Sequence, residues 1–446
     1  MSSKINMSRR DFLRTGAAAG LIGLSPRILW GAEAPSNRVR LCVAGVHSRG
    51  RGRFPMMRAA EMPGVEVACV CDVDSRARVW AAEAVKGISG RIPIQEVDIR
   101  RVLDDKNVDG VICEVPDHWH APMAWMTMEA GKHIYVEKPC AFTAEEGEIL
   151  VRVQRKTGKV FQMGNQRRSS VAYRRAIAEL RQGLLGEMKY ARTWYRNCRK
   201  PIGRGGPASV PDWLDWNLWL GPAPRIPYRT NLVHYNWHWF WRYGTGEISN
   251  NAVHYLDVAR WAMGADMPCK VSTVGGRYCG DDDWEWPDTQ MISCEFPNRQ
   301  LITWEGLSCL PGEKPHDTYA GAMVYGTKGS VLFHPSDYCV LYDAAGKVVR
   351  EWRADDVPAG KNTTWKDKLD YRHVENFTEA IRANDSSVAR SQVVDSVRST
   401  HITILGNISL RTGETLKVDP VTGRILGGRG RQYWKTDYEP GWEYRG

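Results

Sequence analysis

The sequence contains no apolar run long enough to cross a bilayer, so we expect no membrane-spanning helix. It has no RNP motif, zinc-finger spacing or basic helix, and the basic residues behind its net charge of +10 are dispersed, so we expect no nucleic-acid partner. Its 11 cysteines include no CxxC pair and no Cys/His cluster, which predicts buried small side chains, with no disulfide framework and no metal site. With 446 residues and 43% hydrophobic content, the chain can form two domains with buried cores.

Residues 1–34 resemble a twin-arginine export signal. Arg9 and Arg10 precede a short run rich in alanine, glycine and leucine, and the segment ends on the small-x-small sequence Ala32-Glu33-Ala34. The resemblance implies a periplasmic or otherwise exported protein, carried already folded by the twin-arginine translocation machinery. The alternative is an ordinary amphipathic N-terminal helix.

The segment from Asn37 onward predicts a βαβ unit: a strand, a glycine-rich turn, a helix and a second strand that ends at Asp72. The turn matches GxGxxG at its first and last glycines, with a histidine at the middle position, where the backbone normally approaches a pyrophosphate. This pattern predicts a dinucleotide site. The candidate cofactor-binding residues of the turn are Gly45, His47, Ser48, Arg49 and Gly50.

Asp72 favours NAD over NADP as the cofactor. A carboxylate at the end of the second strand, about twenty residues beyond the glycines, accepts hydrogen bonds from the ribose hydroxyls and repels a 2′-phosphate. Arg76 and Arg78 follow closely enough to leave NADP open, and Asp72 could instead cap the next helix.

Strands continue to alternate with helices as far as an apolar strand that ends at Lys138, which predicts a doubly wound parallel sheet. Because open sheets of this kind bind ligands at the carboxyl ends of their strands, Lys138 stands at a candidate site.

The motifs "VPDHWHAP", "EAGKHIYVEKP", "MGNQRR" and "GTGEISNNAVHYLDVARW" resemble those of the Gfo/Idh/MocA oxidoreductases, specifically the exported branch. The resemblance runs in order from about residue 38 to the C-terminus. It implies a Rossmann NAD(P)-binding domain over residues 37–164. It further implies a substrate-binding and oligomerisation α/β domain over residues 165–446, with a large, mostly antiparallel sheet and a dimeric or tetrameric assembly. The aromatic C-terminal arm would cover a partner or a pocket, or lie in solvent.

The resemblance also places a catalytic pair. Within Glu137-Lys138-Pro139, the glutamate contacts the cofactor and the lysine projects between nicotinamide and substrate, while His254 takes the proton of a sugar hydroxyl as hydride leaves the same carbon. A partly desolvated lysine has a lowered pKa, which suits proton exchange. The alternative for Lys138 is a surface lysine in a polar turn.

Helical spacing predicts Asn250, His254 and Asp257 on one face of a helix. Many relatives have aspartate at the position of Asn250; an amide cannot act as a base, so we expect Asn250 only to hydrogen-bond a substrate hydroxyl. Asp257 is expected to orient His254 and to contact the substrate site. The alternatives are a salt bridge for Asp257 and a structural Asn/His pair.

The resemblance implies four further contacts. Pro116 and His120 would lie near the nicotinamide, and Gln166 and Arg167 would contact nucleotide or sugar, although the arginine could also pair with a surface acid. In the tryptophan-rich segment 201–243 we expect most indoles to pack in a core, with Trp241 as the candidate that faces a sugar ring.

These features predict an exported NAD-dependent oxidoreductase that transfers hydride between the nicotinamide and a carbinol carbon of a sugar, glycoside or sugar derivative. One alternative is an NAD-dependent glycoside hydrolase that oxidises its sugar transiently; it is disfavoured because "GRGGP" at 203–207 lacks the histidine of that branch. The other is a non-catalytic sugar-binding relic, which His47 and Asn250 suggest and Lys138 and His254 oppose.

Overall fold

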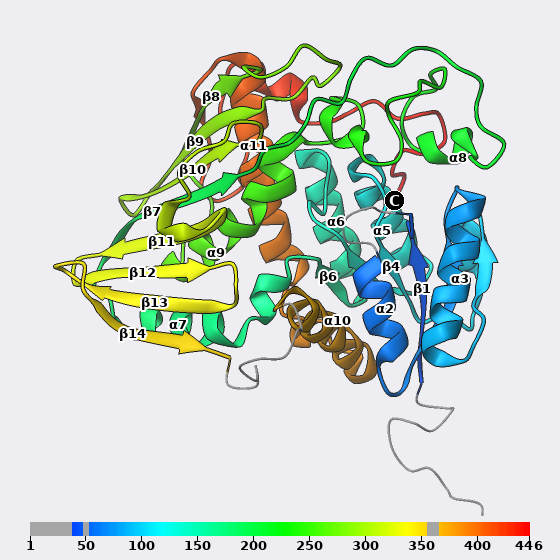
Figure 1. Ribbon diagram of the computed structural model, residues 1–446, viewed down its shortest axis with the longest axis horizontal. Coiled ribbons are helices and arrows are strands. Elements are labelled where there is room, and N and C mark those ends of the chain that lie inside the picture. Colours follow the sequence, from blue (N-terminus) through cyan, green and yellow to red (C-terminus); the bar gives the residue numbers. More distant parts are fainter. Residues whose placement is uncertain (1–37, 48–52, 355–364) are drawn as a thin grey trace, which may run out of the picture.

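Two sheets of different type organise the protein (Figure 1). The structure is a computed structural model that describes residues 38–47, 53–354 and 365–446. The predicted export signal, residues 1–34, lies outside the described residues.

The first sheet is parallel, as predicted, and has six strands in the order β3-β2-β1-β4-β5-β6. Its central strands are buried along their whole length because helices cover both faces. The strands are β1 (Val39–Ala44), β2 (Val65–Cys71), β3 (Ile94–Glu96), β4 (Gly110–Cys113), β5 (His133–Val136) and β6 (Phe161–Met163). The helices are α2 (Arg53–Glu61), α3 (Ser75–Ser89), α4 (Ile99–Asp104), α5 (Asp117–Glu129) and α6 (Ala144–Thr157).

The second sheet has nine strands in the order β14-β13-β12-β11-β7-β10-β9-β8-β15. Only the β7–β10 pair is parallel among the described strands of this sheet, which confirms the mostly antiparallel prediction. Hairpin turns at "FPNRQ" and "DAAGK" join β9 to β10 and β13 to β14. The strands are β7 (Met188–Arg196), β8 (Lys270–Gly276), β9 (Thr289–Phe296), β10 (Gln300–Leu307), β11 (Ala320–Gly326), β12 (Gly329–His334), β13 (Tyr338–Asp343), β14 (Val348–Arg353) and β15 (Leu416–Lys417).

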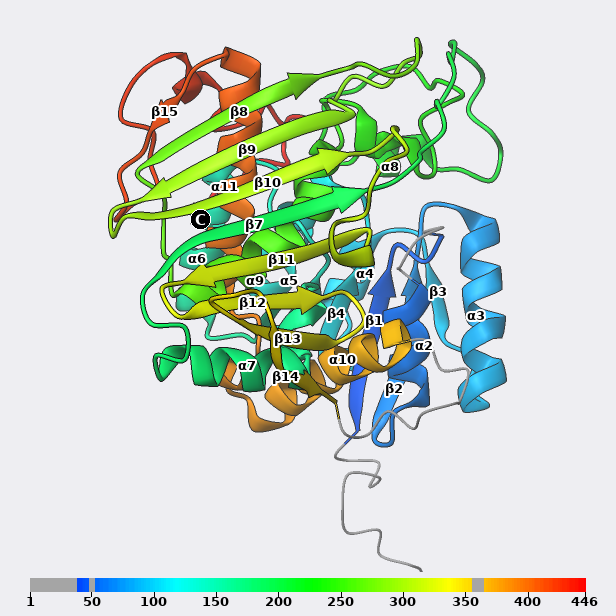
Figure 2. The same ribbon diagram turned by 60° about the vertical axis from the view of Figure 1, so that its left-hand side comes forward.

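Long helices cover only one face of this sheet (Figure 2). The other face carries a smaller buried apolar cluster of Trp194, Met323, Leu332 and Val340. Alternate residues of β10 are buried, as expected for a strand with one covered face. The covering helices are α7 (Val171–Arg181), α9 (Val253–Met263) and α11 (Val393–Thr412). No helix among the described residues is long and apolar enough to span a membrane.

Helix α10 (Trp365–Ala383) returns to the first sheet, where Val374 and Phe377 join the core beside β1 and α2. The first sheet ends with β6 at Met163, and the first strand of the second sheet, β7, begins at Met188. The first core is nevertheless completed by a helix from near the C-terminus.

The C-terminal arm packs on its own chain. Tyr438 donates a 2.7 Å hydrogen bond to Glu146, and the ring of Trp442 lies 4.9 Å from that of Trp119. The arm therefore covers α5 and α6. The remaining short helices are η2 (Gln166–Ser169), α8 (Trp216–Leu220), η3 (Asn236–Trp239), the π-helix η4 (Ile248–Ala252), η5 (Pro315–Asp317), η6 (Ser386–Val388) and η7 (Arg429–Tyr433).

Candidate active site

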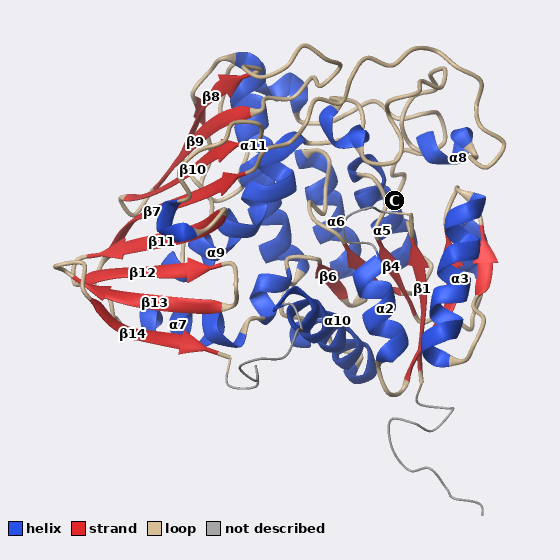
Figure 3. Ribbon diagram, in the orientation of Figure 1, coloured by secondary structure: helices blue, strands red, loops and turns tan. Residues whose placement is uncertain are grey.

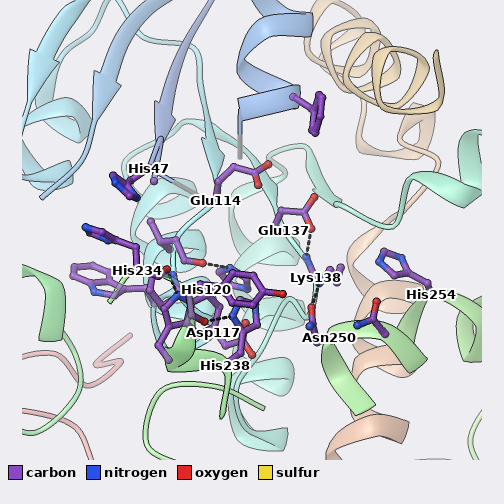
Figure 4. A pocket seen from close by; sticks show the side chains of 18 of the residues that line it. His47, Glu114, Asp117, His120, Glu137, Lys138, His234, His238, Asn250 and His254 are labelled. Carbon is purple, nitrogen blue, oxygen red and sulfur yellow. Dashed lines mark hydrogen bonds between the residues drawn. The ribbon is translucent and has the colours of Figure 1, made fainter. Parts of the chain in front are cut away.

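A cavity of about 740 Å³ lies at the carboxyl ends of the parallel strands, between the first sheet and the second domain. Figure 4 shows side chains from both parts of the chain pointing into it. The predicted site residues that line it are Gly45, His47, Asp72, Pro116, His120, Glu137, Lys138, Arg167, Asn250 and His254.

Lys138 bridges the two domains. It follows β5, its peptide bond with Pro139 is cis, and its Nζ donates a 2.8 Å hydrogen bond to Oδ1 of Asn250 in η4. The carboxylate of Glu137 accepts a 3.1 Å hydrogen bond from the backbone N–H of Lys138. The lysine is therefore held inside the cavity and is not a surface residue.

His120 holds the turns around the lysine in place. Its Nδ1 lies 2.6 Å from the carbonyl oxygen of Pro139, and its Nε2 lies 2.8 Å from that of Val115. The ring thus links the loop after β4 to the loop after β5. This contact fixes the position from which Lys138 projects.

Glu247 explains the asparagine at position 250. The glutamate is buried and ion-paired to Arg199 at 2.8 Å, and its Oε1 accepts a 3.3 Å hydrogen bond from Nδ2 of Asn250. Since the amide nitrogen faces an acceptor and the amide oxygen faces the Lys138 ammonium, only an amide satisfies both neighbours. A carboxylate at position 250 would be repelled by Glu247.

Asp257 lies away from the cavity, contrary to the prediction of one shared face. It is fully buried and accepts hydrogen bonds from Arg168 at 2.8 Å, Asn165 at 2.8 Å and Ser399 at 2.6 Å. His254 and Asp257 both belong to α9, and the side chains of Arg168, Asn165 and Ser399 hold the Asp257 carboxylate in the core. The alternative stated above, a salt bridge, therefore applies to Asp257, and its partner is Arg168.

The nucleotide end of the cavity fits a dinucleotide. Gly45 has φ of +86°, and a Cβ on it would lie 2.4 Å from the carbonyl oxygen of Glu114, so the turn needs glycine there. Asp72 accepts hydrogen bonds from the backbone N–H groups of His47 at 3.0 Å and Asp74 at 2.9 Å. Burial raises the pKa of Asp72 to about 6, although these hydrogen bonds oppose the rise.

Asp74, rather than Asp72, caps helix α3, because its side chain accepts from the backbone N–H groups of Arg76 and Ala77. Asp72 is left available for ribose hydroxyls. The guanidinium of Arg76 pairs with Asp74 at 2.8 Å, and that of Arg78 bonds the carbonyl of Asp72. Both arginines are thus engaged within the protein, which favours NAD over NADP.

A segment of the second domain, residues 197–243, crosses to the nucleotide end; Figure 3 shows that most of it is loop. The carbonyl of Trp213 accepts a 2.9 Å hydrogen bond from the N–H of Ser75, and the Trp213 ring lies 3.6 Å from the guanidinium of Arg76. His234 donates a 2.9 Å hydrogen bond to Asp74 and stacks on His47 at 3.8 Å. We call these contacts, made by Trp213 and His234 with His47, Asp74, Ser75 and Arg76, the clasp.

The clasp brings His47, Asp74 and His234 close enough to offer ligand atoms to a metal ion, within 4.8 Å of one another. However, Asp74 already accepts from Arg76 and from the first turn of α3. Burial and the neighbouring His47 lower the pKa of His234 to about 4, so the neutral ring donates to the carboxylate. These contacts explain the three side chains as a hydrogen-bonded link between the loop 197–243 and the nucleotide end. The absence of a metal stays a prediction.

Some predicted residues lie elsewhere. Gln166 sits behind the cavity, where its amide donates a 2.7 Å hydrogen bond to Asp370. Trp241 lines a second, smaller cavity and packs on Trp286 at 3.8 Å, because the chain turns after η3. Ser48, Arg49 and Gly50 lie outside the described residues.

Several cavity residues were not predicted from the sequence: Arg199, His234, Tyr235, His238 and Asn251 line it, and Glu247 supports it. His234 and His238 lie within the tryptophan-rich segment, where the sequence predicts a sugar contact from an indole. The signal that could have found them is the polar side chains between those indoles. Among the indoles, Trp219 and Trp237 line the cavity and the others pack as predicted.

Family comparisons agree with this geometry. The sequence profile of an oxidoreductase family with an NAD-binding Rossmann fold matches residues 39–165. The profile of the C-terminal α/β domain of the same family matches residues 200–279. The chain belongs to the Gfo/Idh/MocA oxidoreductases. The NAD-binding Rossmann domain predicted from the glycine turn and Asp72 is therefore confirmed.

Two relatives resemble the chain over most of its length. An α-N-acetylgalactosaminidase of Shewanella oneidensis is 29% identical over 410 residues, which cover 82% of this chain and 81% of the relative. A glycosyl hydrolase family 109 protein of Shewanella sp. strain MR-4 is 25% identical with the same coverage.

Solved structures share the fold. Levoglucosan dehydrogenase with NADH and levoglucosan aligns with a TM-score of 0.66 at 18% identity, covering 85% of this chain and 99% of that one. An oxidoreductase domain protein from Kribbella flavida aligns with a TM-score of 0.67 at 18% identity, covering 86% and 99%.

Proposed function

We propose that this protein transfers hydride between the nicotinamide of NAD and a carbinol carbon of a sugar, glycoside or sugar derivative. One observation carries the proposal: Lys138, Asn250 and His254 lie on one side of a cavity that also contains Asp72 and the glycine turn (Figure 4). The bound cofactor would supply a hydride acceptor at its nicotinamide. The cavity volume suits a nucleotide end plus a small polar molecule.

The protein supplies the proton chemistry. Oxidation of a carbinol releases the hydroxyl proton together with the hydride, so a base must stand at the hydroxyl oxygen. His254 is that base, and the Lys138 ammonium donates a hydrogen bond to the same oxygen as it becomes a carbonyl. The Arg199–Glu247–Asn250 chain fixes the direction of the lysine.

A second candidate is a glycoside hydrolase cycle. In it the sugar is oxidised, the glycosidic alcohol leaves by elimination, water adds to the double bond that results, and the carbonyl is reduced again, so that the cofactor ends unchanged. Its support is the set of relatives named as family 109 glycosyl hydrolases and as an α-N-acetylgalactosaminidase, which match over 82% of this chain. Both candidates begin with the same oxidation. They differ in whether a free alcohol leaves the sugar.

We also propose export with the cofactor already bound. The twin-arginine resemblance of residues 1–34 supports export, and the clasp over the nucleotide end supports retention of NAD.

The face of the nine-stranded sheet that carries no long helix is the proposed surface of a homo-oligomer. On this face Val274 is 63% and Met291 53% exposed.

The test begins with protein purified without added cofactor. Nucleotide released on denaturation is identified by mass spectrometry, and the bound cofactor is then challenged with glycosides while absorbance at the NADH band is followed. Reduction without a released alcohol supports the dehydrogenase, and released alcohol without net reduction supports the hydrolase. Protein that neither contains nor binds NAD or NADP would refute both candidate functions.

Export has its own test. Replacing Arg9 and Arg10 by lysine should retain the protein in the cytoplasm if export is correct.

A further inference from the structure

His238 lines the cavity from η3, in the tryptophan-rich segment (Figure 4). Its Nδ1 lies 2.7 Å from the carbonyl oxygen of Tyr235. A carbonyl oxygen can only accept, so the ring proton stays on Nδ1, and Nε2 keeps its lone pair.

The ring is held in one orientation and in one protonation state. It stacks on Trp237 at a centroid distance of 3.6 Å and an interplanar angle of 17°. Burial, and then the nearby positive charges of Lys138 and Arg199, lower the pKa of His238 well below its ordinary value. A neutral, weakly basic imidazole suits recognition better than proton removal.

Two cations of the cavity act on His238. Lys138 and Arg199, whose charges lower its pKa, line the same cavity and can only donate hydrogen bonds. A sugar hydroxyl both donates and accepts, so a hydroxyl that receives a hydrogen bond from one of these cations still needs an acceptor for its own hydrogen, and Nε2 of His238 offers one.

We propose that Nε2 of His238 accepts a hydrogen bond from a substrate hydroxyl other than the one that is oxidised, which makes His238 a specificity-determining residue. This inference rests on the proposed function, because it takes the occupant of the cavity to be a polyhydroxylated sugar.

Two substitutions separate the two ends of the ring. In His238→Asn the amide nitrogen can replace Nδ1 and keep the Tyr235 contact, but no atom reaches the position of Nε2. In His238→Gln the longer side chain places its amide oxygen near Nε2 and gives up the Tyr235 contact. Thermal unfolding and bound-nucleotide content show whether each variant is folded and loaded.

The probes are levoglucosan and the methyl glycosides of glucose, galactose and N-acetylgalactosamine, followed by monodeoxy analogues of the best one. We expect His238→Asn to raise KM about tenfold with kcat changed little, and His238→Gln to recover most of that loss. For the wild type, removal of one particular sugar hydroxyl should raise KM by a similar factor. For His238→Asn, removal of the same hydroxyl should raise KM no further.

Equal losses for every deoxy analogue in wild type and variant would overturn the inference, as would a collapse of kcat at unchanged KM. Calorimetric binding of the same sugars separates this failure from failure of the proposed function. If the effects of His238→Asn and of one missing hydroxyl are coupled but the sugar does not reduce NAD, the inference stands and hydride transfer is refuted. Sugar binding with no coupling would refute the inference alone, and absence of all sugar binding would refute both.

Discussion

The ammonium group of Lys138 and the side-chain oxygen of Asn250 lie 2.8 Å apart, and this hydrogen bond joins the first domain to the second across the cavity. The amide that receives it is itself oriented by the buried Glu247. The lysine is therefore aimed by groups on the opposite wall.

Removal of this acceptor should lower turnover. A hydrogen bond to a charged group contributes about 1.5–3 kcal/mol, so Asn250→Ala should reduce kcat by about 10- to 160-fold if the bond positions Lys138 for the transition state. Stopped-flow reduction of bound NAD by a saturating glycoside measures this.

Asn251→Ala is the matched control, because Asn251 also lines the cavity and bonds Glu247 but makes no bond to Lys138. Its kcat should stay within about threefold of wild type. Equal losses in the two variants would show that the Glu247 network matters and the lysine contact does not.

The parts of the site that depend on local sequence were predictable. Gly45, Asp72 and Lys138 stand at strand ends, where position follows from the alternation of strands and turns. The burial of Asp257 away from His254 was not predictable, because its hydrogen bonds with Arg168 and with Ser399 of α11 depend on how distant segments pack together. His238 is brought to Lys138 only by the fold of a long loop, so no spacing rule could have found it.

The affinity for NAD should depend on pH through Asp72. Because burial raises the pKa of this carboxyl to about 6, above its ordinary value of 3.8, the carboxylate becomes protonated as pH falls through 6. The protonated form is a poorer acceptor for ribose hydroxyls, so NAD affinity of the cofactor-free protein should fall between pH 7 and pH 5. Calorimetric titration across this range measures the change.

Asp72→Ser should bind NAD more weakly and lose this pH dependence. Asp98→Ser is the control: Asp98 lines the same cavity, and although burial opposes it, hydrogen bonds from Arg100 lower the pKa of Asp98, which stays ionised throughout. A wild-type affinity that is flat from pH 7 to pH 5 would contradict the assignment of Asp72 to the ribose.

Asp257 should matter for stability rather than for chemistry. Asp257→Asn leaves the buried guanidinium of Arg168 without its main counter-charge, and breaking a buried pair costs about 3–5 kcal/mol. The midpoint of thermal unfolding should fall clearly, while kcat/KM per folded enzyme stays within about threefold. Ser399→Ala, which removes one hydrogen bond to the same carboxylate, should cost about 1 kcal/mol. Lost turnover at an unchanged unfolding midpoint would instead support a role in orienting His254.

The clasp should control how fast the cofactor leaves. The ring of Trp213 lies 3.6 Å from the Arg76 guanidinium, next to the Asp74–His234 bond that closes the nucleotide end. A cation–π contact contributes about 0.5–2 kcal/mol, so Trp213→Ala should speed NADH release by about 2- to 30-fold. Displacement of bound NADH by excess NAD, followed by fluorescence, measures the rate.

Trp80→Ala is the control. It removes a similar cation–π contact, with Arg53, from the same helix α3 but outside the clasp, and it should leave the rate of NADH release unchanged. If both variants release NADH at the wild-type rate, retention does not depend on the clasp, and the proposal of export with bound cofactor loses its structural support.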